Sequence, residues 1–141
     1  MKILFLIIFS IAISQVHLYA QDKQDEDRIE TEYKACLGND TSVVTICNCS
    51  FKAYAKWNDQ MEYYYKKLLR EIPIDTAKQI AKKAQGAWLT WRDTEFGTYN
   101  CIFDKEGSMW NRVRAEERLN MMRERAQQLR AYYEVLKHNK D

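Results

Sequence analysis

The stretch that decides the fold is Lys82–Asp93, KKAQGAWLTWRD, a run with helical character. Gln85, Trp88 and Arg92 follow one another at intervals of three and four residues, so a helix places them on one face. An amide, an indole and a guanidinium on one stripe serve either as a ligand site or as a polar seam that fixes how helices pack. Spacing alone favours the seam.

The rest of the chain is poor in residues that break helices. Pro73 is the single proline, and Gly38, Gly97 and Gly107 are the glycines outside the opening stretch. We expect breaks at residues 37–41, at 72–75 with Asp75 capping the next helix, and at Gly107–Ser108. Long helices with short connections fold back on one another, so we expect an all-α protein, an antiparallel bundle of about four helices.

Apolar residues recur at helical spacing in the segments between these breaks, which predicts the core faces. In the last segment two seven-residue series follow one another: Ala115, Met122, Leu129 and Leu136, then Leu119, Ala126 and Tyr133. The second segment has two such series: Cys47, Tyr54, Met61 and Leu68, then Phe51, Asn58, Tyr65 and Ile72. The third places one broad face on Ala77, Ile80, Ala81, Ala84, Trp88 and Trp91.

The N-terminus is typical of an exported protein. Lys2 precedes an apolar run over residues 3–13 and a short polar stretch that closes at Ala20. This order and length predict a signal peptide at residues 1–20 rather than a membrane span. Residues 21–141 are long enough for a single helical domain, which we expect in a bacterial periplasm or outside the cell, with no membrane anchor after cleavage.

The charges argue against nucleic acid as a partner. Without the signal peptide, 21 Lys and Arg face 20 Asp and Glu, a net charge near +1 that gives no basic face or stripe. Residues 22–32 are rich in acids, whereas residues 112–130 contain six arginines. Solvated helix surfaces explain both blocks, and a docking surface is the alternative.

All four cysteines follow the predicted signal peptide, and in an exported chain an even number indicates disulfides. They lack the partners of a metal site, so we expect no metal. Helix pairing about the two turns puts Cys36 level with Cys47 and Cys49 level with Cys101, which favours these pairs. The pairing of Cys36 with Cys49 and of Cys47 with Cys101 fits the same heights nearly as well.

Motifs for catalysis and for cofactors are missing. His138 is the single histidine after the signal peptide, and there is no phosphate-binding loop or dinucleotide fingerprint. We therefore expect neither an enzyme nor a cofactor, although an unrecognised hydrolase is a third, weaker alternative. The chain is rich in Trp and Tyr, which serve as core volume or, where exposed, contact sugars or a protein partner.

The opening stretch resembles a family signature. Residues 84–93, AQGAWLTWRD, are similar to the AQ-x-x-W-L-x-x-R-D pattern of the small exported bacterial domain named after the LprI lysozyme inhibitor. The resemblance extends over residues 33–133. It also rests on these residues: Cys36, Cys47, Trp57, Met61, Tyr65, Leu68, Gly107, Ser108, Arg123, Glu124, Arg125 and Leu129.

Two departures from the family pattern involve cysteines. Phe96 and Glu117 stand where the family usually has Cys, which is what the loss of one disulfide as a unit would produce. Cys49 and Cys101 are then additions, consistent with a replacement bridge between the second and third helices. We interpret the signature residues as architecture rather than as a ligand site. They are Gln85, Trp88, Arg92, Asp93, Tyr65 and Arg125.

The resemblance implies a non-enzymatic binding protein that occludes the cleft of a lysozyme or another muramidase. The candidate binding edge is the Gly107–Ser108 loop, with Tyr99, Trp110 and Arg112 near it. The alternative is an envelope ligand-binding or scaffold module with no lysozyme target, whose exposed aromatics contact glycan or a partner helix. None of these features specifies an oligomeric state.

Overall fold

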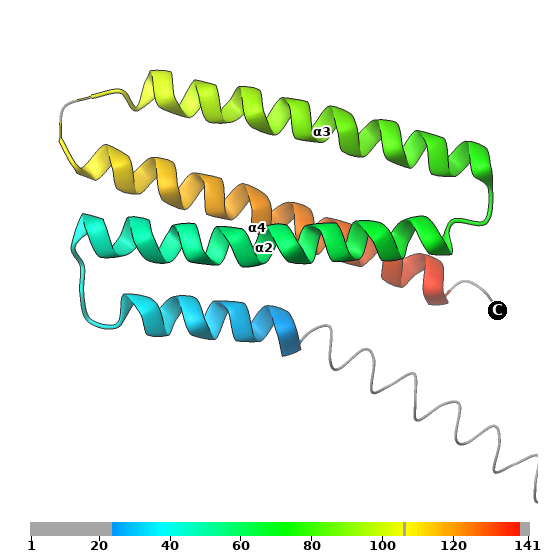
Figure 1. The fold of residues 1–141 in the computed structure, drawn as a ribbon, viewed down its shortest axis with the longest axis horizontal. Helices are drawn as coiled ribbons and strands as arrows, with labels where there is room; N and C mark the ends of the chain where they lie inside the picture. The colour runs from blue at the N-terminus through cyan, green and yellow to red at the C-terminus, as the bar shows by residue number, and fades with distance from the viewer. Residues whose placement is uncertain (1–23, 106, 139–141) are drawn as a thin grey trace, which may run out of the picture.

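The structure, a computed structural model, describes residues 24–105 and 107–138; the predicted signal peptide lies outside them. Residues 24–37 are helical, and α2 (Val43–Glu71), α3 (Asp75–Ile102) and α4 (Met109–His138) follow. Consecutive helices run in opposite directions along one long bundle (Figure 1). The all-α, four-helix prediction is confirmed. None of the helices in the described ranges is long and apolar enough to cross a membrane.

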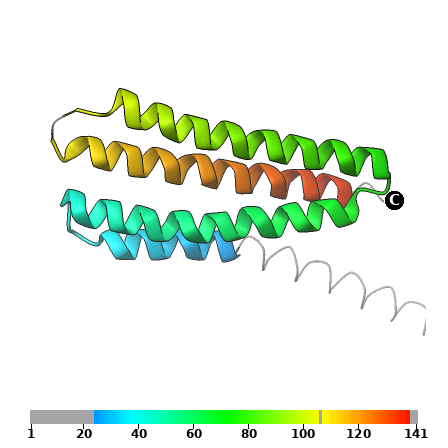
Figure 2. The same cartoon turned by 45° about the horizontal axis from the view of Figure 1, so that its top comes forward.

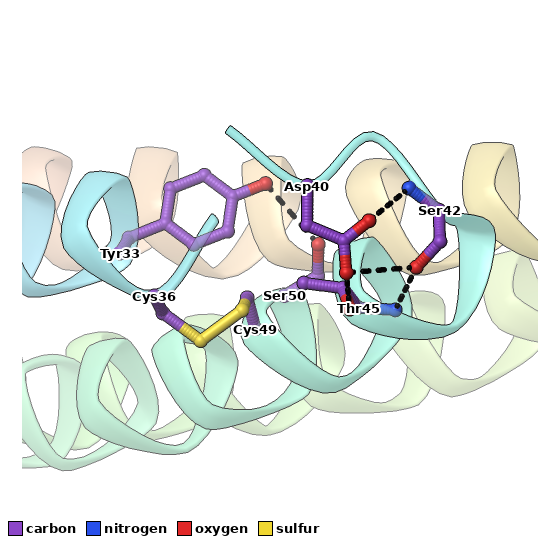
Figure 3. The surroundings of a disulfide bond; sticks show 7 residues. All are labelled: Tyr33, Cys36, Asp40, Ser42, Thr45, Cys49 and Ser50. Atoms are coloured by element: carbon purple, nitrogen blue, oxygen red, sulfur yellow. Dashed lines mark hydrogen bonds between the residues drawn. A yellow bond between two sulfur atoms is a disulfide. The ribbon is translucent and has the colours of Figure 1, made fainter. Parts of the chain in front are cut away.

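Short side-chain contacts set where α2 begins. Ser42 is the N-cap of α2, and its hydroxyl accepts a hydrogen bond from the Thr45 N–H. The Asp40 carboxylate accepts a hydrogen bond from the Ser42 N–H at 2.8 Å. It also accepts from the hydroxyl groups of Ser42 and Thr45 (Figure 3). The bonds from Thr45 and then Ser42 lower the pKa of Asp40. At α3 the capping prediction was wrong, because Ile74 is the N-cap and Asp75 lies inside the first turn.

The hydrophobic core forms between residues 24–37, α2 and α4. Trp57, Tyr64 and Met122 are fully buried in it. In α4 both seven-residue series point inward, as their spacing predicts, although Ala115 and Leu136 are only partly buried. The core-facing residues of α2 are Ile46, Cys49, Ser50, Ala53, Trp57, Met61, Tyr64 and Leu68.

The predicted core face of α2 was therefore partly wrong. Met61 and Leu68 are buried, but Phe51 is 72% exposed. The first helix packs on the side of α2 that carries Trp57, whose Nε1 donates to Glu30, and Phe51 lies outside this buried face. Figure 2 shows residues 24–37 running directly along α2.

The acidic and arginine-rich blocks meet each other inside the bundle. Glu30 accepts a hydrogen bond from Arg123 Nε at 2.7 Å and another from Trp57 Nε1 at 3.1 Å. Glu26, only 5% exposed, pairs with Arg130 at 2.8 Å. Removing one partner of such a pair leaves a charge in a poorly solvated place, so these contacts constrain how the first helix docks. Interpreting both blocks as solvated surfaces was wrong at these positions.

The disulfide joins Cys36 to Cys49, with an S–S distance of 1.98 Å (Figure 3). The favoured pairs of Cys36 with Cys47 and of Cys49 with Cys101 were therefore wrong. Cys49 lies on the buried face of α2 toward the first helix, where the Tyr33 hydroxyl also contacts the Ser50 hydroxyl at 3.2 Å. Cys47 points to the opposite side, because two residues span about 200° of a helix. Cys47 and Cys101 are free thiols.

Helix α3 lies against the core instead of within it. Its one buried residue is Gln85, whereas Ile80 and Trp91 are 68% and 51% exposed. The broad apolar face predicted for this helix was therefore wrong at Ile80 and Trp91, although Trp88 is partly buried and packs against the core. The Gln85 carbonyl accepts hydrogen bonds from Arg125 Nε at 3.0 Å and NH2 at 2.7 Å, and its amide donates to Met61 Sδ at 3.5 Å. One amide thus links α3 to both α4 and α2.

Prediction on the disulfide. Peptide mapping of the unreduced protein is expected to yield a Cys36–Cys49 cross-link, and alkylation without reductant is expected to label Cys47 and Cys101, since both are free. Recovery of a Cys36–Cys47 peptide would contradict the observed packing of the first helix.

Prediction on pH. Because the folded pKa of Asp40 is lowered, its stabilisation is present above the ordinary Asp pKa of about 3.9 and is lost as the pH falls through the folded value. The melting temperature of the parent is expected to exceed that of Asp40→Ala by a constant margin above about pH 5, and this margin is expected to shrink below about pH 4. If the difference in melting temperature between the parent and Asp40→Ala does not change down to pH 2, about two pH units below the ordinary Asp pKa, the Asp40 carboxylate does not stabilise the fold in this way.

Prediction on Gln85. Burial lowers the pKa of the Arg125 guanidinium, so loss of its amide partner leaves a partly desolvated charge. Gln85→Ala is expected to reduce the free energy of unfolding by about 1–3 kcal/mol in urea titrations. Gln79→Ala, an exposed position of the same helix, is the matched control and is expected to change it little. Equal losses for the two variants would contradict the role of Gln85.

Candidate functional site

Arginines and aromatic rings alternate in a column between α3 and α4. The Arg125 guanidinium lies 5.2 Å from the Trp88 ring centre, and Arg92 lies 5.8 Å from Trp88 and 5.9 Å from Phe96. The Phe96 ring also contacts Arg118, whose guanidinium lies 5.0 Å from the ring centre. Cation–π contacts of this kind stabilise more strongly where water is excluded. The column continues the link that Gln85 makes and ties α3 to α4 along its length.

The remaining signature residues lie beside this column. Arg92 donates through Nε at 2.8 Å and NH2 at 2.7 Å to Asp93, its neighbour in the chain. Tyr65 is partly buried and packs against the hydrophobic core. The structural role of the signature residues stays a prediction.

A chain of aromatic rings continues toward the connection between α3 and α4. The ring of Tyr54 lies 6.2 Å from Phe96, Phe96 lies 6.4 Å from Tyr99, and Tyr99 lies 6.1 Å from Phe103. The last contact is a stack of Phe103 on Trp110, 5.6 Å apart and 15° from parallel. Burial, together with Glu95, Glu117 and Glu124, raises the pKa of Tyr99, so its phenol is protonated at neutral pH.

The predicted binding edge lies at this end of the bundle. Gly107 adopts a φ of +111°, where a side chain would be strained, and Ser108 precedes the first turn of α4, its carbonyl accepting from the Asn111 and Arg112 N–H groups. Trp110 is held by Phe103, and the Lys105 ammonium lies 4.8 Å from the Trp110 ring centre. Arg112 is exposed and pairs with Glu116 at 3.1 Å. The structure therefore brings Tyr99, Trp110 and the loop to one end, with Arg112 one turn further along α4.

A groove of about 990 Å³ opens between α2, α3 and α4 next to this edge. The backbone of α3 stays further from α2 than that of α4 does, which leaves this space open. Residues from all three helices and from the connection line it: Cys47, Asn48, Ser50, Phe51, Tyr54, Phe96, Asn100, Asp104, Asn111, Arg114, Ala115 and Arg118.

Two arginines give the groove its chemistry. Arg114 NH1 donates to the Phe103 carbonyl at 3.0 Å, and its NH2 group contacts Asn111. Arg118 NH2 donates to Asn100 Oδ1 at 2.9 Å, while its Nε is buried and bonded to none of the described residues. Other arginines of the bundle, such as Arg123 and Arg130, pair with carboxylates. Within the described ranges, neither groove arginine does.

The sequence did not single out this groove. Its residues come from four separate segments, and the arginines belong to a charge block that resembles any helix surface. The spacing of Phe96 and Asn100, four residues apart, was a usable signal, since it places both on one face of α3. Among the described residues, no group of His, Cys, Asp and Glu is arranged to hold a metal ion.

Comparisons with known proteins place the chain. It is similar in fold to the crystal structure of an uncharacterized protein from Burkholderia thailandensis, with a TM-score of 0.73 and 25% identity. The superposition covers 79% of this chain and 56% of that protein, so this chain spans little more than half its length. No curated protein matches in sequence. The sequence model of the family described as lysozyme inhibitor LprI matches residues 35–129. This match covers most of the chain, and the protein belongs to the LprI lysozyme inhibitor family.

Proposed function

We propose that this protein is an exported, non-enzymatic binding protein that inhibits a lysozyme or another muramidase by occluding its cleft. The family match over residues 35–129 is the observation that carries this proposal. Export is supported by the Cys36–Cys49 disulfide, because such bridges persist in oxidising compartments outside the cytoplasm. Residues 1–20 supply the expected signal peptide, and the periplasm or the cell exterior is the expected location.

The binding surface in this proposal is the end of the bundle at the connection from α3 to α4. Gly107 lets the chain turn there with open space around it, and Trp110 presents a ring already fixed against Phe103. A fixed aromatic loses little conformational entropy on binding, which favours affinity. Lys105 and Arg112 add positive charges to the same edge.

Positive groups suit the proposed target because glycosidases that cleave wall polymers use a pair of carboxylates in the cleft. A loop that brings Arg112 and Ser108 toward such a pair would offer charge-assisted hydrogen bonds where substrate normally sits. Inhibition would then be steric and polar, and it would need no catalytic group in the inhibitor. These positive charges lie close together at the binding edge, so they can contact the carboxylates of the cleft although the protein has no large net charge.

Prediction on inhibition. Purified protein with its disulfide intact is expected to slow the clearing of a bacterial cell-wall suspension by at least one class of lysozyme, saturating near one molecule per enzyme. The measurement is the initial rate of turbidity loss against inhibitor concentration. Folded protein that slows no class would contradict the proposal and favour the ligand-binding or scaffold alternative.

A matched pair of variants locates the surface. Arg112→Ala is expected to weaken inhibition by roughly threefold to tenfold, as for a charged contact at an interface. Lys66→Ala is the control, because Lys66 also lies in an exposed ion pair four residues apart, with Glu62, but on α2 away from the edge. Equal weakening by both variants would show that the edge is assigned wrongly.

A further inference from the structure

We propose that the groove between α2, α3 and α4 is a binding site for an acidic sugar, a pyranose ring that carries a carboxylate. This site is separate from lysozyme inhibition, and it requires no lysozyme to be tested. The argument rests on the charges, the amides and the exposed rings that line the groove.

The carboxylate follows from the two arginines. Each guanidinium has more N–H donors than its protein contacts use, and Arg118 Nε is a buried donor with no acceptor among the described residues. A carboxylate is the acceptor that pairs most strongly with a guanidinium, and the partners of these two arginines in the described ranges are uncharged oxygens. Asp104 also lines the groove, so its lining carries two positive charges and one negative. The balance favours a ligand with a single negative charge over a polyanion.

The sugar ring follows from the rest of the lining. Phe51 is 72% exposed and stands on the groove with Tyr54, so flat apolar surfaces are available for stacking on the apolar face of a pyranose. The amides of Asn48, Asn100 and Asn111 line the same groove. Amides both donate and accept, which matches hydroxyl groups. The groove volume of about 990 Å³ is that of a site for a small ligand.

An extended acidic peptide fits less well. Apart from Asp104 in the connection, the lining residues lie in helices, so most of the backbone N–H and C=O groups there are already paired. An extended peptide bound in such a groove would find no strand edge for its own amides. The arginines and amides of the lining also disfavour binding of the apolar face of a partner helix, because that face would leave them without hydrogen-bond partners. A small polar ligand makes its hydrogen bonds to side chains and avoids both problems.

The test is a titration of the isotope-labelled protein, followed by ¹H–¹⁵N NMR, with two matched pairs of sugars. N-acetylmuramic acid differs from N-acetylglucosamine by a carboxylate-bearing ether, and glucuronic acid differs from glucose by its carboxylate. We expect saturable shifts of the Asn48, Asn100 and Asn111 side-chain amides, with an acid binding roughly tenfold more tightly than its neutral partner. Preference for the muramic acid would point to cell-wall glycan as the source, and preference for the uronic acid to another acidic polysaccharide.

Variants check the location. Arg118→Gln and Phe51→Ala are each expected to weaken binding of the preferred acid roughly tenfold. Arg70→Gln and Val44→Ala, both exposed on α2 outside the groove, are expected to leave it unchanged; Val44 is 71% exposed, nearly as much as Phe51. If Arg118→Gln fails to fold, Phe51→Ala still decides, since so exposed a side chain contributes little to the core.

Three results would overturn the proposal. The first is equal affinity for the acidic and neutral sugars. The second is shifts confined to residues outside the groove. The third is saturation by an acidic tetraglutamate peptide, with no saturation by any of the four sugars.

Discussion

The contact between Gln85 and Arg125 is the constraint on which the arrangement of the bundle depends. Three helices bury a common hydrophobic core, and α3 adds to its edge only the partly buried Trp88 and Leu89. The contacts that orient α3 are one buried amide and the column of arginines and rings that follows it. Such contacts are directional, so they fix the height and rotation of α3 without drawing it into the core.

This mode of attachment explains where the candidate site lies. A helix packed through an apolar stripe would close onto both neighbours, whereas α3 leaves a groove toward α2. The aromatic chain from Tyr54 to Trp110 runs from this groove to the connection before α4. The groove and the loop edge are thus parts of one end of the molecule, built on rigid helices, and the opposite end of the bundle carries neither.

The sequence predicted the features that depend on local pattern. Few helix breakers implied long helices and their turns, and the seven-residue series of α4 identified its buried face, because that helix contacts the core along one stripe. The helical interval that places Gln85 on the stripe with Trp88 and Arg92 likewise predicted that Gln85 links neighbouring helices. A polar residue at a helical interval on an apolar face needs a partner.

What failed depends on neighbours that a single helix does not reveal. The first helix rotates α2 so that Trp57 is buried and Phe51 is exposed, and the same rotation turns Cys49, not Cys47, toward Cys36. Heights along antiparallel helices left both pairings open. The azimuth of α2 places Cys49 against Cys36, and the Cys47–Cys101 bridge of the alternative pairing was wrong, because both of these cysteines are free. The groove was missed because its residues come from three helices and a connection. The spacing of apolar residues along one helix does not show how far that helix lies from its neighbours.

We propose that the α3–α4 end of the bundle meets the target enzyme. Hydrogen–deuterium exchange of the protein, alone and saturated with a lysozyme that it inhibits, tests this directly. We expect slower exchange over residues 99–118, around the connection and the first turns of α4, with little change in the middle of α2. Protection confined to residues 24–37 and to α2 would place the binding surface on the opposite side and contradict the account.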